Sequence, residues 1–146
     1  MAYKVMDIAN ELLKRAADNG GGDLLTNLKL QKMLYYEQGF HLAYFNEPLF
    51  NEPIEAWQYG PVVPVVYEYY KNWGRSGIEP EEREFLFTGP KEKALFEEVF
   101  RVYGAYSAVG LMNMTHSEMP WSSTPTGVGN VIALDKLKTY FKKRLK

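Results

Sequence analysis

A chain of 146 residues suits one domain, and it is long enough to bury a core without disulfides or a structural metal. The net charge of −1 provides no overall field for nucleic acid or an anionic membrane, and the absence of cysteine excludes disulfides, thiolate zinc sites and a cysteine nucleophile. Charges interrupt residues 1–20 and no apolar run reaches membrane-spanning length, so we expect no signal peptide, no membrane and a cytoplasmic protein.

The apolar pattern predicts two helices in the first third of the chain. Residues 3–18 carry apolar side chains at three-and-four spacing, which gives one buried face. Residues 26–44 begin with Thr26, a good N-cap, and are apolar on several sides, so we expect neighbours to cover this helix on several sides. The glycine run at 19–22 is interpreted as a C-cap and turn, because a phosphate loop would follow a strand.

The middle of the chain predicts a strand, a helix and a loop. Residues 53–59 have the pattern of a short strand, which the Gly-Pro pair at 60–61 ends. Pro64 suits the first residue of a third helix, where its missing N–H does no harm. The polar residues 74–84 predict a loop, and residues 85–87 a short strand or an extended segment.

A glycine separates the next two predicted helices. The fourth helix begins near Pro90 and ends at Gly104, with its apolar side chains on one face. Ser107 is expected to cap the fifth helix. Four residues of this helix are predicted to be buried: Val109, Leu111, Met112 and Met114.

The last third of the chain completes the predicted fold. Residues 119–130 are punctuated by proline and glycine, which indicates a loop. Residues 131–133 can form a short edge strand, and Asp135 is expected to cap a final helix. The sequence therefore predicts a mainly α protein: a single compact domain over residues 1–146, with about six helices and a few short β-strands.

Polar residues interrupt the apolar second helix and its expected neighbours. We predict that they form a polar structural seam, which holds the fold together and performs no chemistry. The seam consists of Lys32, Gln38, His41, Glu55, His116 and Glu118.

The same region offers an alternative function, a small metal-dependent hydrolase. Glu37 and His41 are four residues apart and share a helix face, and a segment with His116 and Glu118 could fold back on them. No H-E-x-x-H spacing and no G-x-S-x-G motif is present, so we predict no metal, no cofactor and no catalytic residue.

The final helix offers a second alternative, a DNA-binding phage regulator. Its basic side chains could contact phosphates, but the helix dipole also favours positive charge at a C-terminus. The residues concerned are Lys136, Lys138, Lys142, Lys143, Arg144 and Lys146. Nucleic acid is therefore not the partner that we expect.

Aromatic residues make up 15% of the chain, which is too many to bury completely. Tyrosine and tryptophan are typical anchors of protein interfaces. We predict a partner-binding face that contains Tyr35, Trp57, Tyr59, Tyr67, Tyr70, Trp73 and Trp121.

Several blocks of this sequence resemble the Panacea domain of SocA-like bacterial and prophage antitoxins. The first block is residues 28–42, LKLQKMLYYEQGFHL, and the second runs from residue 48 through YGPVVP at 59–64. The likeness resumes at residues 103–121, with THSE followed by Pro120 and Trp121, and covers nearly the whole chain. In family members a small aliphatic residue often stands in place of Glu37.

The resemblance implies an antitoxin and not an enzyme. Members neutralise co-encoded toxins, commonly by direct binding, and one member hands its toxin to the ClpXP protease. The partners implied for this chain are therefore a cognate toxin protein and, by the adaptor route, a ClpXP-type protease. The resemblance also implies an association with prophages and gives no catalytic residues.

Overall fold

The computed structural model describes residues 2–18 and 24–145 of a mainly helical fold, so the predicted turn at 19–22 lies outside the described residues. The elements in chain order are α1 (Val5–Asp18), α2 (Asn27–Phe45), β1 (Glu55–Trp57), β2 (Gly60–Val62), α3 (Pro64–Tyr70), the 3₁₀ helix η1 (Lys71–Trp73), α4 (Pro90–Tyr103), α5 (Ala108–His116), α6 (Met119–Ser122) and α7 (Leu134–Lys142).

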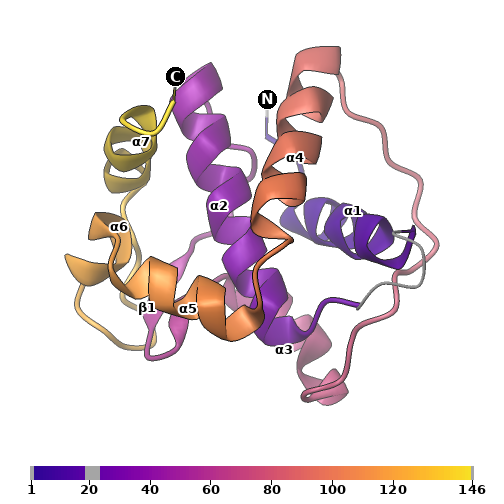
Figure 1. The fold of residues 1–146 in the computed structure, drawn as a ribbon, viewed down its shortest axis with the longest axis horizontal. Helices are drawn as coiled ribbons and strands as arrows, with labels where there is room; N and C mark the ends of the chain where they lie inside the picture. The colour runs from indigo at the N-terminus through magenta and orange to yellow at the C-terminus, as the bar shows by residue number, and fades with distance from the viewer. Residues whose placement is uncertain (1, 19–23, 146) are drawn as a thin grey trace.

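Helix α2 runs through the middle of the molecule, with α4 and α7 on either side of it (Figure 1). The Thr26 hydroxyl caps it as predicted, by accepting a hydrogen bond from the backbone N–H of Lys29 at 3.2 Å. At the other end Asn46 takes a left-handed conformation (φ 60°), and its N–H donates to the carbonyl of Leu42. Residues 30–39 are all buried, so the expected cover on several sides is confirmed.

Helix α7 packs closely on α2 through one glycine. A Cβ atom at Gly39 would lie 2.2 Å from the ring of Phe141, so only glycine leaves room for this ring. The ring joins an aromatic cluster in which Tyr36 and Tyr103 stack at 4.0 Å and Phe40 lies 4.8 Å from Phe141. The core of the fold therefore extends from α2 to both flanking helices.

The strand predicted at 53–59 is half of a hairpin: β1 ends before Gly60 and Pro61 as predicted, but these two residues begin a second strand that the sequence did not predict. β1 and β2 pair antiparallel, with Ala56 opposite Pro61. Ala56 directs its N–H to the carbonyl of Asn130 and its own carbonyl to the N–H of Gly127. The pair is thus not mutually hydrogen-bonded, and a proline without an N–H fits there at no cost.

The C-terminal third corrects three further predictions. Residues 119–122, expected to be part of a loop, form the short helix α6. Val109 is 57% exposed, although Leu111 is fully buried as expected. Ala133, and not Asp135, occupies the N-cap position of α7. Asp135 lies in the first turn, where its negative charge interacts favourably with the helix dipole without capping the helix.

The segment from 74 to 89 runs along the outside of α1 as an extended strap and then enters α4 (Figure 1). The side chain of Asn10 binds this strap through two hydrogen bonds. Its amide N–H donates to the carbonyl of Glu81 at 2.9 Å, and its amide oxygen accepts from the Glu81 backbone N–H at 2.8 Å. Residues 85–87 form no strand. The rings of Phe85 and Phe87 instead pack against Tyr3 at 5.3 and 5.5 Å.

Candidate partner-binding site

Two amides at the start of α2 fix the hairpin and α3 in place. The Gln31 side chain accepts from the backbone N–H of Val63 at 2.8 Å and donates to Asn27 at 2.8 Å. Asn27 in turn donates to the carbonyl of Tyr67 at 3.1 Å. Sequence reasoning missed both amides, although their spacing of four residues could have indicated that they share a helix face.

A pocket of about 690 Å³ opens where α2, the hairpin, α3 and the segment 126–128 meet. Its walls include the aromatic side chains of Trp57, Tyr59 and Tyr67, and Trp57 meets Tyr67 edge to face at 5.2 Å. Tyr59 is 61% exposed because it occupies the hairpin turn. Pockets of this size that are rich in aromatic residues are common binding sites.

Lys32 lines this pocket and is completely buried. Its Nζ atom has no hydrogen-bond partner, and burial lowers the pKa of the amine to about 7. Gly60 lies directly over it, since a Cβ atom there would be 2.7 Å from the Lys32 Cε atom. The site therefore combines an aromatic wall with a buried amine that lacks a counter-charge.

The predicted aromatic face divides into exposed and buried members. Tyr59, Tyr67 and Trp73 are exposed, and Trp57 is half-buried. The expectation that Tyr35 and Tyr70 belong to this face is wrong, because both are buried in the core. We call the three exposed residues and the half-buried Trp57 together the aromatic rim: Trp57, Tyr59, Tyr67 and Trp73.

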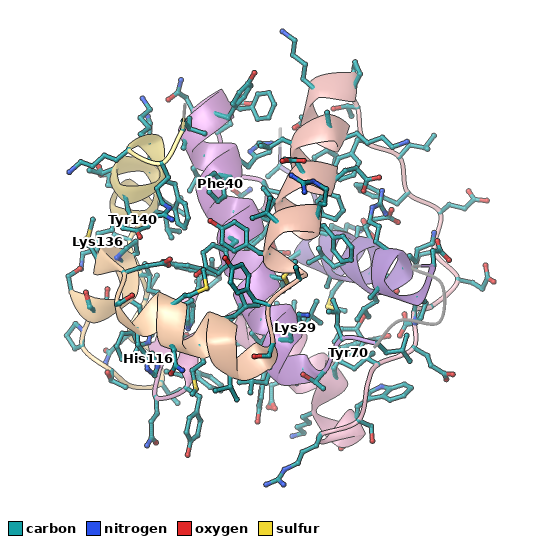
Figure 2. The ribbon with its side chains drawn as sticks, viewed as in Figure 1. Lys29, Phe40, Tyr70, His116, Lys136 and Tyr140 are labelled. Carbon is teal, nitrogen blue, oxygen red and sulfur yellow. The ribbon has the colours of Figure 1, made fainter. Side chains whose placement is uncertain are left out.

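Trp121 is half-buried and supports the rim from behind. Its indole N–H donates to the carbonyl of Trp57 at 2.9 Å, and its ring stacks on His116 at 4.1 Å. Figure 2 labels His116 at the end of α5. The Glu55 carboxylate joins the hairpin to the segment that contains Gly129. It accepts hydrogen bonds from the Trp57 indole N–H at 2.9 Å and from the Gly129 backbone N–H at 2.8 Å.

The residues of the predicted polar seam lie in separate clusters and do not form one continuous seam. Gln38 fixes residues 49–50, by donating to the carbonyl of Phe50 and accepting from the Leu49 N–H, each at 2.7 Å. His41 reaches the carbonyl of Glu47 at 2.7 Å and the carboxylate of Glu92 on α4 at 2.9 Å. Neither side chain lies with Lys32 at the pocket.

Glu118 forms a third cluster, with the hydroxyls of two tyrosines. Tyr35 and Tyr36 donate to its carboxylate at 2.9 and 3.0 Å. Burial raises the pKa of Glu118 even though both hydrogen bonds oppose the rise. The hydroxyl of Tyr35 is therefore occupied inside the fold and offers nothing to a partner.

The residues of the metal alternative do not come together. His41 bonds to Glu92, His116 stacks on Trp121, and Glu118 accepts from the two tyrosines. Glu37 is buried with one carboxylate oxygen unpaired. Over residues 2–18 and 24–145 no three side chains of His, Asp or Glu are grouped as a metal site requires.

Two of the basic residues, Lys136 in α7 and Arg144 just after it, have contacts within the fold. Lys136 donates to the carbonyl of Ser123 at 3.0 Å and the hydroxyl of Thr124 at 3.2 Å, and the Arg144 guanidinium lies over the ring of Tyr140 (Figure 2 labels Lys136 and Tyr140). These contacts account for two of the charges without a phosphate.

Comparisons with known proteins identify the family of this chain. The family model of the antitoxin SocA-like Panacea domain matches residues 30–122, which include α2, the hairpin and α5. The chain belongs to the SocA-like, Panacea-domain antitoxin family. Antitoxin SocA of Caulobacter vibrioides (strain NA1000 / CB15N) is 34% identical over 140 residues, which cover 87% of this chain and 73% of the relative.

No solved structure matches this chain. In the part of the chain that the structure describes, no helix has the length and apolar character needed to cross a membrane.

Proposed function

We propose that this protein neutralises a toxin encoded beside it by binding the toxin directly through the aromatic rim. The observation that carries the proposal is the position of Tyr59 and Tyr67, which are exposed and line one pocket. Large aromatic side chains beside a pocket are the typical centre of a protein interface. Membership of an antitoxin family supplies the kind of partner.

The rim is held by rigid elements, which supports its role in recognition. The hairpin is fixed to α2 by Gln31 and to the segment 126–131 by the backbone of Ala56. A face that is ordered before binding loses less conformational entropy when the partner arrives. We therefore assign recognition to the rim and no catalytic role to any residue.

The test is co-expression with each neighbouring gene, followed by calorimetry with the toxin that is found. Growth rescue by the wild-type protein is expected. Tyr59→Ala and Tyr67→Ala are expected to raise the Kd by at least about tenfold, as removal of an interface anchor does. The matched control is Tyr44→Ala, since Tyr44 is 55% exposed and does not line the pocket.

Two outcomes would contradict the proposal. If no neighbouring gene is toxic, the antitoxin role of this chain fails. If Tyr59→Ala and Tyr67→Ala bind the toxin as tightly as Tyr44→Ala does, neutralisation takes place without the aromatic rim.

The adaptor route and the prophage association remain predictions from the family resemblance, and the cytoplasmic location remains a prediction from the sequence. Delivery to a ClpXP-type protease predicts that the antitoxin shortens the half-life of the toxin in cells that contain the protease. The half-life is measured by immunoblotting after translation is stopped, in cells with and without ClpX. An unchanged half-life would leave neutralisation by binding alone.

A further inference from the structure

The buried amine of Lys32 has no partner of opposite charge among residues 2–18 and 24–145. Its side chain is 0% exposed and its Nζ atom makes no hydrogen bond. A buried cation without a counter-charge is costly, and such an unpaired group in a native fold calls for an explanation. Burial lowers the pKa of the Lys32 amine to about 7, as the removal of water from a charged group does.

The pocket beside Lys32 has the composition of a site for an anion with an apolar body. Two of its lining residues are cationic, Lys32 and Lys71, and none is acidic. The rest of the wall is largely aromatic and aliphatic, with Trp57, Tyr67 and Val62 among its members. Its volume of about 690 Å³ is in the range of small-molecule sites.

Two hydrogen-bond donors of the pocket wall are already used within the fold. The Asn27 amide donates to the carbonyl of Tyr67, and the backbone N–H of Gly127 donates to Ala56. A phosphate would need several donors as well as charge. Because Lys71 is paired with Glu68 at 3.3 Å, Lys32 is the unpaired cation among the lining residues, and one such charge matches a singly charged carboxylate better than a doubly charged phosphate.

We propose that this pocket binds a small organic carboxylate, with its apolar or aromatic body against Trp57 and Tyr67 and its carboxylate paired with Lys32. The flexible four-carbon stem of lysine lets the amine meet a carboxylate at the pocket wall. The carboxylate supplies the counter-charge that the fold lacks. This inference is independent of the toxin and concerns the free protein.

The test uses two probes of nearly equal shape and different charge, 3-phenylpropionate and its neutral analogue 3-phenylpropionamide. Each is titrated into the full chain and followed by NMR at the indole of Trp57. The carboxylate is expected to bind with a Kd on the order of 1 mM, typical of a fragment of this size. The amide is expected to bind at least about tenfold more weakly, because it lacks the charge-assisted hydrogen bond.

Variants assign the preference to the buried lysine. Lys32→Met keeps the length of the side chain and is expected to abolish the preference for the carboxylate. Lys71→Met is the matched control, since Lys71 lines the same pocket but is exposed and already paired with Glu68 at 3.3 Å. It is expected to change the Kd of the carboxylate by less than about threefold, as screened surface charges do.

A second measurement needs no variant. The pKa of the Lys32 amine, followed by NMR of a selectively labelled lysine, is expected to rise when 3-phenylpropionate is added and to stay constant with the amide.

Three results would overturn the proposal. The first is an equal Kd for the two probes, and the second is a preference for the carboxylate that the Lys32→Met variant still shows. The third is a pKa of the Lys32 amine that stays constant when 3-phenylpropionate is added. Absence of saturable binding at concentrations on the order of 20 mM would overturn it as well. Because no toxin takes part, these results leave the proposed antitoxin function standing or falling on its own test.

Discussion

The buried polar residues of α2 fall into two kinds. Gln31 and Gln38 have partners at both ends of their amides, so each one joins α2 to a different segment. Lys32 and Glu37 each leave a buried polar atom without a hydrogen bond. The paired residues stabilise the fold, whereas the unpaired ones cost stability that substitution can recover.

Glu37 provides a prediction about pH. Burial raises the pKa of its carboxyl group well above the ordinary value; Arg15 opposes the rise and Glu97 adds to it. The folded state therefore keeps a proton that the unfolded state loses above about pH 4.3. The stability from neutral Glu37 is fully present below that pH and falls as pH rises toward the folded pKa.

Glu37→Gln removes this titration, so at pH 7 the variant is expected to be more stable than the wild type by about 1 kcal/mol. The gain is expected to vanish near pH 4. Urea unfolding at a series of pH values measures both. A gain that is the same at every pH would show that packing, and not ionisation, sets the cost of Glu37.

Lys32 provides the opposite pH dependence. Its folded pKa of about 7 lies below the unfolded value, so the unfolded state binds more protons between about pH 7 and pH 10.4. The penalty for burying the charge is complete below pH 7 and disappears as pH rises through that interval.

Lys32→Met is expected to stabilise the fold by roughly 3 kcal/mol at pH 6 and by much less at pH 10. Chemical unfolding at the two pH values measures this difference. A variant that is less stable than the wild type at pH 6 would mean that the amine has a partner in solution.

At the scale of elements, the close packing of α7 against α2 requires a glycine at position 39. Gly39→Ala improves helix propensity by up to about 1 kcal/mol, but its methyl group would overlap the ring of Phe141. We expect a net loss of roughly 2 kcal/mol of unfolding free energy, as overpacking of a core does. Thermal or urea unfolding measures it.

A second variant, the double substitution Gly39→Ala with Phe141→Leu, tests the contact between these two residues. It removes the overlapping ring, so the cost of Gly39→Ala is expected to be smaller in this background than in the wild type. Equal costs in the two backgrounds would show that the contact between Gly39 and Phe141 does not hold α7 in place.

How far the sequence predicts these elements depends on whether the signal is local. The caps at Thr26 and Ser107 and the start of α3 at Pro64 are local chemistry, and the structure confirms all three. β2 was missed because Pro61 is a strand breaker by rule, and only the backbone of the segment 126–131 makes it acceptable.

The candidate site was harder to predict than the fold, because it depends on contacts between distant segments. Composition indicates an aromatic surface, but it does not tell which rings face outward, so Tyr35 and Tyr70 were placed wrongly. The pocket over Lys32 combines residues from α2, the hairpin, α3 and residues 126–128. No pattern within one of these segments reveals it.

At the scale of the whole molecule, the strap from 74 to 89 connects the rim side of the fold to α4. Asn10→Ala removes both of its hydrogen bonds to Glu81. We expect hydrogen exchange of the Glu81 amide to rise by roughly tenfold, the effect of about one lost hydrogen bond, while amides in α2 keep their protection. Exchange followed by NMR measures both.

The control is Arg83→Ala, which removes half-buried ion pairs with Asp7 at 2.8 Å and with the Glu81 carboxylate at 3.5 Å but leaves the backbone of Glu81 bonded to Asn10. It is expected to have a smaller effect than Asn10→Ala, since partly exposed ion pairs contribute little. If both variants speed exchange throughout α2, the strap is part of the global folding unit.

The hairpin turn at Gln58 and Tyr59 has a consequence for how this protein can evolve. Both side chains are exposed, whereas the packing that holds the fold surrounds α2. Substitutions at these two positions change the side chains on the surface but not the packing around the buried helix α2. Under the proposed function, a lineage can thus exchange one toxin for another in a few substitutions while the buried packing around α2 is kept.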